Sequence, residues 1–399
     1  MEHNPITEQE LLQFRKETKG TGQKIHFNNA GASLSPDVVV SAVVDYLQEE
    51  ALVGGYEIEA RYKEQLDNTY PLIARLINAS PDEIAVVENA SQAWGLAFNG
   101  IDFKKDDVII TSEMEYVTNL LGFLHVKKTH GVSIRVIPND ADGNFSLPEL
   151  EAAITPQTRL IAITHIASTA GGMTPIAEIG NIARKHGILY LVDACQTAGQ
   201  VPINVEEIGC DILSVTGRKY LRAPRGTGFL YVRKQVQKDL APFFMDGHTA
   251  LLNSENDYVI RDDGRRFELY EKNRALTLGL AKAVEYALNI GVDRIWQRIQ
   301  LLAGSMRQQL KAMECITVHD SGGQQCGIVT FSLNGLDSEL VKNKLAQRDI
   351  NVSVGLAKST LLYMNKNHLS SIIRASVHYY NTETEIKALC DALTGIAGH

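Results

Sequence analysis

A carboxylate and a lysine on either side of one predicted strand are the residues of this sequence best suited to chemistry. Asp193 ends the apolar run ILYLV, and Lys219 follows the next apolar run, DILSV. Both would lie at the carboxyl ends of neighbouring strands, where parallel α/β sheets bind their ligands. A lysine beside Arg218 and Tyr220 is a candidate amine nucleophile for Schiff-base chemistry, although most lysines are solvated surface residues.

The residues around this pair indicate what ligand could bind there. A carboxylate at the end of a buried strand needs a partner to offset its desolvation. The protonated pyridine nitrogen of pyridoxal 5'-phosphate (PLP) is a suitable partner for Asp193, and this pairing keeps the ring an electron sink. Thr216 and Arg218 offer a hydroxyl and a guanidinium suited to phosphate. The alternative is that Asp193 merely caps the next turn.

The elements that must position these residues alternate between short apolar runs and helical patterns, which predicts a mostly parallel sheet covered on both faces. The apolar runs are 84–87, 107–111, 132–137, 159–165, 188–193, 211–215 and 228–232. Upstream, two helices are expected over 35–52, with Ser35 as the cap, and over 55–78.

The second half of the chain differs in character. A polar, turn-rich stretch from about 234 to 273 predicts a long loop, which is uncommon unless it is functional or contacts another subunit. A long helical region over 274–313 precedes alternating strand and helix patterns. We therefore expect a large domain over 25–273, with residues 1–34 contributing to the substrate site, and a linking helix with a small α+β domain over 274–399.

Composition excludes several function classes. The 399 residues carry a net charge of -8, which argues against non-specific nucleic-acid binding. No apolar run approaches the roughly 20 residues of a membrane span, and the polar N-terminus is unlike a secretory signal. Five scattered cysteines and dispersed histidines form no metal-binding spacing, so reduced thiols in a cytoplasmic protein and no metal site are expected.

The segment LVDACQTAGQVPINVEEIGCDILSVTGRKYLRAPRGTGFLYV resembles the PLP signature of class V aminotransferases and cysteine desulfurases, which have fold type I. The resemblance extends over nearly the whole chain. It implies an α/β enzyme in which Asp193 pairs with the pyridine nitrogen and Gln196 hydrogen-bonds the ring hydroxyl. Thr216 and Arg218 would bind the phosphate, and Lys219 would hold PLP as a Schiff base.

Other segments match the family more loosely. VVENASQAWGLAF resembles its phosphate cup, which implies Ala90, Ser91 and Gln92 at the phosphate, because a helix N-terminus favours an anion. The alternative for this segment is an ordinary capped helix. Tyr116 occupies the position of the ring that stacks on PLP, where many members carry histidine. Ser168 occupies a position where many members carry asparagine.

The resemblance also implies which residues lie near the substrate. Arg374, in IIRASVHYYNTETEI, resembles the small-domain arginine that grips the substrate α-carboxylate. Its alternative is a surface arginine on an edge strand. Asn119 and the loop residues Asn29, Ala30 and Gly31 are expected near the substrate.

The absence of a cysteine from one loop indicates which reaction this chain is expected to catalyse. Desulfurases of this family need a cysteine on a mobile small-domain loop, and the matching stretch 351–371 contains none. We therefore expect a C–S lyase that performs β-elimination on a cysteine-derived amino acid, similar to hercynylcysteine sulfoxide lyases and cysteine/cystine lyases. An aminotransferase is the alternative, a desulfurase is less expected, and a PLP-fold protein without catalysis is the third hypothesis.

The resemblance also implies a homodimer. The family brings a loop across the dimer interface to the phosphate, and RRFELYEKN (265–273) lies at the matching position. The usual threonine of that loop is absent, and Glu271 lies in the same stretch.

Overall fold

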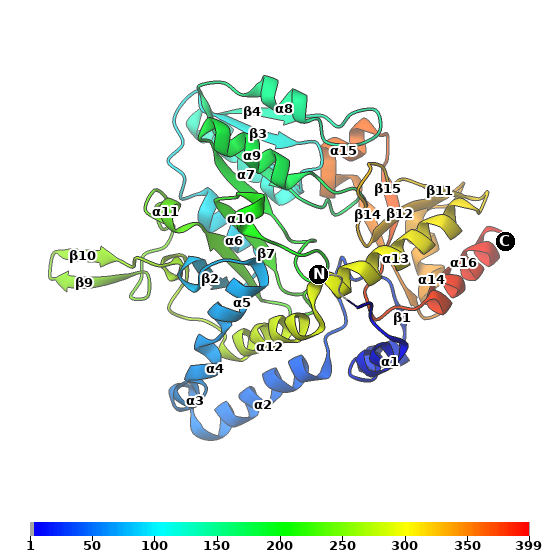
Figure 1. Ribbon diagram of the computed structural model, residues 1–399, viewed down its shortest axis with the longest axis horizontal. Helices are drawn as coiled ribbons and strands as arrows, with labels where there is room; N and C mark the ends of the chain where they lie inside the picture. The colour runs from blue at the N-terminus through cyan, green and yellow to red at the C-terminus, as the bar shows by residue number, and fades with distance from the viewer. Residues whose placement is uncertain (1–3, 399) are drawn as a thin grey trace.

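The computed structural model describes residues 4–398, and its centre is a seven-stranded sheet in the order β2-β8-β7-β6-β5-β3-β4 (Figure 1). Neighbouring strands are parallel except around β8, which is antiparallel to both β2 and β7. The strands are β2 (Ile84–Val87), β3 (Val108–Ser112), β4 (Ser133–Ile137), β5 (Thr158–Thr164), β6 (Leu189–Asp193), β7 (Ile212–Thr216) and β8 (Gly228–Val232). Each predicted apolar run forms one of these strands, which confirms the mostly parallel sheet.

Helices cover both faces of this sheet, because successive side chains of a strand point to opposite faces. Ile109 packs in one buried cluster with Trp94 of α6. Its neighbour Ile110 packs in another cluster with Ile179 of α9. The helices around the large sheet are α5 (Thr69–Ile77), α6 (Ala90–Phe98), α7 (Val117–His130), α8 (Leu147–Ala153), α9 (Ile176–His186), α10 (Val205–Ile208) and α11 (Lys234–Gln237).

The N-terminal helices differ from the prediction in two places. The expected helix over 55–78 is instead three helices, α3 (Gly55–Arg61), α4 (Lys63–Asp67) and α5, which are separated at Tyr62 and Asn68. Helix α2 (Asp37–Val53) is capped by Pro36 without a side-chain hydrogen bond, so Ser35 is not its cap. Helix α1 (Glu8–Lys16) precedes both and begins with a capping box at Thr7.

The predicted long helical region is two helices, α12 (Arg274–Ile290) and α13 (Val292–Lys311). They are bent by 77° at Gly291, whose positive φ of 91° favours a residue without a Cβ. Among the described residues, no single helix has the length and apolar composition of a membrane span, and only this bent pair reaches them together.

The C-terminal part forms a smaller antiparallel sheet in the order β11-β12-β15-β14. Its elements are β11 (Ile316–Val318), β12 (Ile328–Leu333), α14 (Ser338–Ala346), β13 (Ile350–Asn351), β14 (Ser353–Leu356), α15 (Leu361–Lys366), β15 (Ser371–Ser376) and α16 (Glu383–Ala397). The N-terminal segment is tied to this part, because β1 (Ile25–His26) pairs in parallel with β13.

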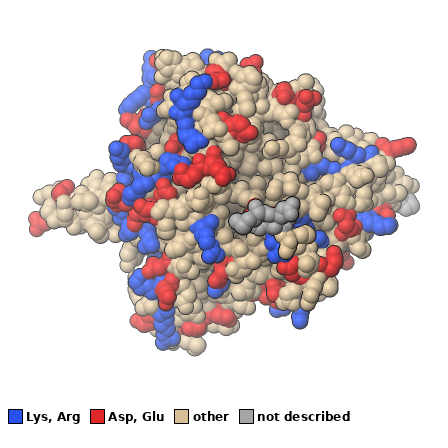
Figure 2. Space-filling view, viewed as in Figure 1, with Lys and Arg blue, Asp and Glu red and all other residues tan. Residues whose placement is uncertain are grey.

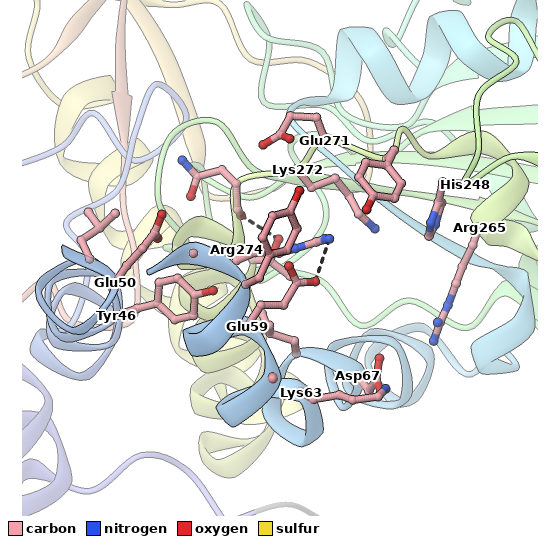
Figure 3. A pocket seen from close by; sticks show the side chains of 18 of the residues that line it. Tyr46, Glu50, Glu59, Lys63, Asp67, His248, Arg265, Glu271, Lys272 and Arg274 are labelled. Carbon is pink, nitrogen blue, oxygen red and sulfur yellow. Dashed lines mark hydrogen bonds and ion pairs between the residues drawn. The ribbon is translucent and has the colours of Figure 1, made fainter. Parts of the chain in front are cut away.

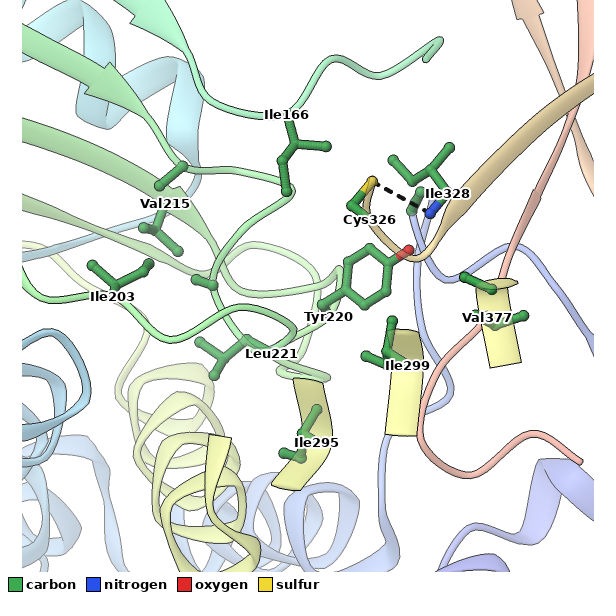
Figure 4. Close-up of a cluster of buried hydrophobic side chains, with 14 of the residues drawn as sticks. Ile166, Ile203, Val215, Tyr220, Leu221, Ile295, Ile299, Cys326, Ile328 and Val377 are labelled. Carbon is green, nitrogen blue, oxygen red and sulfur yellow. Dashed lines mark hydrogen bonds between the residues drawn. The ribbon is translucent and has the colours of Figure 1, made fainter. Parts of the chain in front are cut away.

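A shared core joins the two parts of the chain. Figure 4 shows Tyr220 and Leu221 of the large sheet region packed near Ile299 of α13 and Ile328 of β12. These four side chains are at most 1% exposed. The segment that carries Lys219 is therefore anchored directly against the smaller sheet.

The region predicted as a long loop contains a two-stranded hairpin, β9 (Ala250–Ser254) and β10 (Asp257–Ile260). The hairpin projects from the body of the protein (Figure 1). Its strands carry exposed apolar side chains, with Leu252 82% exposed. The prediction of an unstructured loop was therefore wrong at 250–260, where two strands pair across a short turn.

Candidate active site

The carboxyl ends of the central strands surround a pocket of about 230 Å³. Asp193 ends β6, Thr164 ends the adjacent β5 and Thr216 ends β7 on the other side. Lys219 follows β7 by three residues, and the start of α6 closes the pocket next to it. The lining residues are Asn89, Ala90, Ser91, Tyr116, Thr164, Ile166, Ser168, Asp193, Cys195, Gln196, Thr216, Arg218 and Lys219.

Asp193 is held rigidly at the floor of this pocket. It is 6% exposed. The backbone N–H of Cys195 donates to its Oδ1 at 2.9 Å, and Asn119 Nδ2 donates to its Oδ2 at 3.0 Å. Both hydrogen-bond donors are neutral groups, which leaves the Asp193 carboxylate available to pair with a cationic group of a ligand.

A second, fully buried carboxylate lies behind Asp193 and was not predicted from the sequence. Glu115 Oε1 accepts hydrogen bonds from Asn119 Nδ2 at 2.8 Å and from Thr164 Oγ1. Its Oε2 accepts one from Thr111 Oγ1 at 2.8 Å. Burial, with the charge of Asp193, raises the pKa of Glu115 to about 7, although these hydrogen bonds oppose the shift. Glu115 precedes Tyr116, which was expected at the cofactor, but the sequence does not reveal that the Glu115 side chain points into the interior.

The structure corrects the prediction that Asn119 contacts substrate. It is 3% exposed and bridges Glu115 and Asp193 from the first turn of α7. Its place is therefore behind the pocket, where it orients the Asp193 carboxylate.

Lys219 faces the pocket with its amine in a desolvated setting. Burial lowers its pKa, with opposing contributions from Cys195 and Asp193 and further lowering by Arg218 and Arg374. A lysine with a lowered pKa is more often neutral and hence more nucleophilic near neutral pH. The position and environment of Lys219 suit covalent attachment of a carbonyl cofactor.

Of the three residues expected at the phosphate, Ala90, Ser91 and Gln92, only the first two face the pocket at the start of α6. Ala90 and Ser91 line the pocket, and the helix dipole and free N–H groups at this end favour an anion. Gln92 does not lie among the lining residues. Its backbone N–H donates to Asn89 Oδ1 at 2.9 Å, which caps the helix, and its Oε1 accepts from the Glu88 N–H at 2.8 Å. A side-chain role for Gln92 at the phosphate is therefore not supported.

The N-terminal loop touches the pocket through its carbonyls. Asn29 is fully buried, and its amide is committed to Ser376 O at 2.7 Å and to Tyr380. Ala30 is 1% exposed, and its carbonyl accepts from Gln196 Nε2 at 3.1 Å. The Gly31 carbonyl accepts from Arg218. The Asn29 side chain thus fixes the loop, and the expectation that Asn29, Ala30 and Gly31 lie near the substrate stays a prediction.

Arg374 lies on β15 at the substrate side, beside Ser168. Its Nη1 donates to the Ser168 carbonyl at 2.8 Å, and its buried Nε has no partner among the described residues. Burial lowers its pKa to about 10. Ser168 in turn lies 3.4 Å, oxygen to oxygen, from Thr360 of the 357–360 turn. The small domain therefore contacts Ser168, a residue of the pocket lining, with a hydroxyl and a guanidinium.

The pocket fits PLP on observations of its own. The two hydrogen-bond donors to Asp193 are neutral, and the Gln196 Oε1 atom is buried without a hydrogen-bond partner among the described residues. An aromatic ring carrying a pyridine nitrogen and a hydroxyl would provide a partner to each. Tyr116 is partly exposed at the pocket wall, where a ring can lie against such a ligand.

A larger cavity, of about 710 Å³, lies elsewhere, between α2–α5 and residues 265–277 (Figure 3). Some of its charged residues pair with one another, as Arg274 does with Glu59 at 2.8 Å and Lys63 with Asp67. Glu271 lies on its wall. The described lining includes no residue of the Asp193 and Lys219 pocket. Its size alone is not evidence of catalysis.

Comparison with known proteins agrees with this geometry. The family model Aminotransferase class-V matches residues 25–389. A probable cysteine desulfurase of Methanothermobacter thermautotrophicus is 32% identical over 94% of this chain and 95% of its own. A cysteine desulfurase structure from Thermococcus onnurineus NA1 has a TM-score of 0.92 at 27% identity, with 100% of both chains covered. A cystine C–S lyase structure, at 21% identity and a TM-score of 0.86 over 94% of this chain and 98% of that one, shows a shared fold.

Proposed function

This chain belongs to the class V aminotransferase family and is a PLP-dependent enzyme, and we propose that it is a C–S lyase acting by β-elimination on a cysteine-derived amino acid. One observation carries the proposal. The small-domain turn places Thr360 beside Ser168 of the pocket lining, and the stretch 351–371 contains no cysteine. A persulfide carrier on this loop is therefore missing, while the groups for elimination are in place.

The roles of the residues follow from their positions. PLP supplies an electron sink that makes the substrate α-proton acidic. Asp193 would face the pyridine nitrogen, and Gln196 the ring hydroxyl. Ala90, Ser91 and Thr216 would hold the phosphate at the start of α6.

Lys219 and Arg374 would act on the substrate itself. The Lys219 amine would hold the cofactor and would also take the substrate α-proton, because its lowered pKa favours the neutral base. Arg374 would orient the α-carboxylate through paired N–H groups. Loss of the β-sulfur group and hydrolysis would then give pyruvate and ammonia.

A cysteine desulfurase is the second candidate, because the relatives with the highest similarity given above carry that name. Cys195 lines the pocket and is the one described cysteine that does so. Burial raises the pKa of its thiol well above the usual range, with Asp193 adding to the shift. Since the thiolate is the nucleophile, this environment disfavours attack by Cys195 on a substrate sulfur.

The products decide between the candidates. We expect pyruvate, ammonia and a released thiol from L-cysteine conjugates or L-cystine. Alanine with a persulfide on the protein would instead establish a desulfurase. Conversion of the bound cofactor to its pyridoxamine form without pyruvate would establish an aminotransferase.

A homodimer is part of the proposal. The projecting hairpin exposes Leu251, Leu252, Tyr258 and Val259, all at least 53% exposed. Figure 2 shows that much of this projection is free of charged side chains. Exposed apolar surface of this kind is typical of a protein–protein contact. Light scattering should report about twice the 44.0 kDa chain mass, and a fully active monomer would contradict it.

A further inference from the structure

One side-chain amide joins two buried carboxyl groups behind the pocket. Asn119 Nδ2 donates to Asp193 Oδ2 at 3.0 Å and to Glu115 Oε1 at 2.8 Å. An amide nitrogen carries two N–H groups, so these two acceptors use both. Turning the amide over would bring its oxygen against the Asp193 oxygen, where two acceptors would meet without a hydrogen between them. The two acidic side chains together therefore fix the direction of the Asn119 amide.

Glu115 is in turn held by the central sheet. It is 1% exposed, lies between β3 and α7, and does not belong to the described pocket lining. Its Oε2 accepts from Thr111 of β3 at 2.8 Å. Its Oε1 accepts from Thr164 of the adjacent β5 and from the Tyr116 N–H at 2.9 Å. Glu115 therefore ties the Asn119 amide to two strands of the sheet.

The neutral form of Glu115 preserves these contacts. The donors from Asn119, Thr164 and Tyr116 all meet Oε1, whereas Oε2 faces the Thr111 hydroxyl. A hydroxyl accepts as well as donates, so a proton on Oε2 can be donated to Thr111 without disturbing Asn119. Burial, with the charge of Asp193 adding to its effect, raises the pKa of Glu115 to about 7. Glu115 can therefore hold the amide while Asp193 carries the negative charge toward the ligand.

We propose that Glu115 is a positioning residue of the cofactor site, which acts through the Asn119 amide to hold the Asp193 carboxylate in place for the ring nitrogen of PLP. The proposal rests on the assignment of Asp193 to that nitrogen under the proposed function. In this role Glu115 touches neither cofactor nor substrate but fixes the group that does. Its effect should therefore appear in the affinity for PLP and in the absorption of the bound cofactor, with little change in KM for the substrate.

Two substitutions of similar size separate hydrogen bonding from packing. Glu115→Gln keeps an oxygen toward Asn119 and places its amide nitrogen toward the Thr111 hydroxyl, which can accept. Glu115→Met fills nearly the same volume but offers the Asn119 amide only a weak acceptor. We expect the dissociation constant of PLP to stay within about twofold of the wild type in Glu115→Gln and to rise about tenfold in Glu115→Met, as for loss of one hydrogen bond in a charged network.

Equilibrium dialysis of the holoenzymes measures these dissociation constants, and the absorption band of the bound cofactor should shift only in Glu115→Met. Equal affinities for the three proteins would overturn the proposal. If Glu115→Met does not fold, Glu115→Asp replaces it, because it keeps the acid but shortens its reach by one methylene. Glu115→Asp should weaken PLP binding as well, and an unchanged affinity in that variant would overturn the proposal equally.

A double-mutant cycle tests whether Glu115 acts through Asn119. The amide is gone in the Asn119→Ala background, so Glu115→Met should there change the dissociation constant of PLP by less than about twofold, because groups that act through one network are non-additive. A second tenfold loss in this background would show that Glu115 influences the cofactor by another route, and would overturn its positioning role.

Glu113→Met is the matched control. Glu113 is a second buried acid, two residues earlier in the chain, but its ion pair is with Lys366 at 2.8 Å. Its replacement should leave the affinity for PLP unchanged. A loss equal to that in Glu115→Met would mean that both substitutions act by disturbing this segment as a whole, which would overturn the specific role of Glu115.

Asp193→Asn separates this inference from the proposed function. Unchanged PLP affinity and absorption in Asp193→Asn would overturn the assignment of Asp193 to the ring nitrogen, and with it the positioning role of Glu115. A large loss in Asp193→Asn with none in Glu115→Met would overturn the role of Glu115 alone. Losses in both, with Glu115→Gln close to the wild type, would support the proposal whichever reaction the enzyme catalyses.

Discussion

The two ends of the active-site pocket are built in opposite ways. At the Asp193 end, the carboxylate is hydrogen-bonded by Asn119, which is itself held by buried Glu115. At the arginine end, Arg218 and Arg374 contact only neutral oxygens among the described residues. Folding therefore completes the cofactor end in advance, whereas the substrate end is completed by its ligand. Changes at the first end should alter cofactor chemistry, and changes at the second should alter substrate selection.

The largest effect is expected at the junction of the two ends, where Lys219 serves both. Lys219→Ala should abolish turnover, because it removes both the attachment point and the base. The variant should still retain PLP through the phosphate site and Asp193. Borohydride reduction of the wild-type protein, followed by peptide mapping, should place the cofactor on Lys219. Attachment to any other lysine would overturn the assignment.

The next effect is expected at the arginine end. Arg374→Ala should raise KM and lower kcat/KM by roughly 10²-fold, because loss of a charge-assisted pair costs about 3 kcal/mol. The absorption spectrum of the cofactor without substrate should stay close to that of the wild type, since Asp193 and its partners are unchanged. A large spectral change with an unchanged KM would break the distinction between the two ends.

A smaller effect is expected at the Asp193 end. Asn119→Ala removes one donor to the Asp193 carboxylate, and a single hydrogen bond to a charged group contributes about 1.5–3 kcal/mol. We expect kcat to fall by about tenfold or more, together with a shifted cofactor absorption band and a nearly unchanged KM. Thr118→Ala, one residue earlier on α7, is the matched control. A change in KM alone would contradict a role for Asn119 through Asp193.

The sequence predicted the cofactor end better than the substrate end, for a physical reason. Asp193 and Thr216 end parallel strands, and strand ends in such a sheet meet at one edge whatever the details of packing. Asn119 and Gln92 lie in the first turns of α7 and α6. There, a shift of one residue in position changes whether a side chain points into the pocket or into the protein interior. Their contacts depend on how α6 and α7 pack, and neither spacing nor residue type reveals this.

Glu115, which was not predicted from the sequence, belongs to the hydrogen-bond network behind Asp193. Its titration is expected to make the free energy of unfolding depend on pH. Its pKa is raised to about 7 by burial, above the usual value of about 4.3. The folded protein therefore binds this proton more tightly than the unfolded chain. The resulting stability is fully present below about pH 4.3 and is lost as pH rises toward about 7.

Glu115→Gln tests this dependence by keeping the shape and removing the titration. Between pH 4.5 and 7.5, the free energy of unfolding of the wild type should fall relative to that of the variant, by on the order of 3 kcal/mol at about 1.36 kcal/mol per pKa unit. Urea unfolding at several pH values measures it. Parallel profiles for the two proteins would show that Glu115 stays ionised in the fold.

The smallest effect is expected from removing the thiols, since neither end of the pocket requires one. Cys210 and Cys326 are fully buried, and burial raises the pKa of Cys326 to about 12. Cys315 and Cys390 are partly exposed but do not line the pocket. These four should be replaced by serine in one variant, and Cys195 in a second, so that the pocket thiol is tested alone.

Both variants should keep most of the pyruvate-forming activity if they fold, and circular dichroism provides the check on folding. Cys195 is the decisive thiol, because it is the described cysteine that lines the pocket. A thiol whose pKa is raised by burial beside Asp193 is a poor nucleophile, and Lys219 and Arg374 suffice for elimination. Loss of activity in Cys195→Ser alone, with a persulfide trapped on Cys195 in the wild type, would instead establish sulfur transfer. The substrate end of the pocket would then be completed by a protein thiol rather than by the ligand.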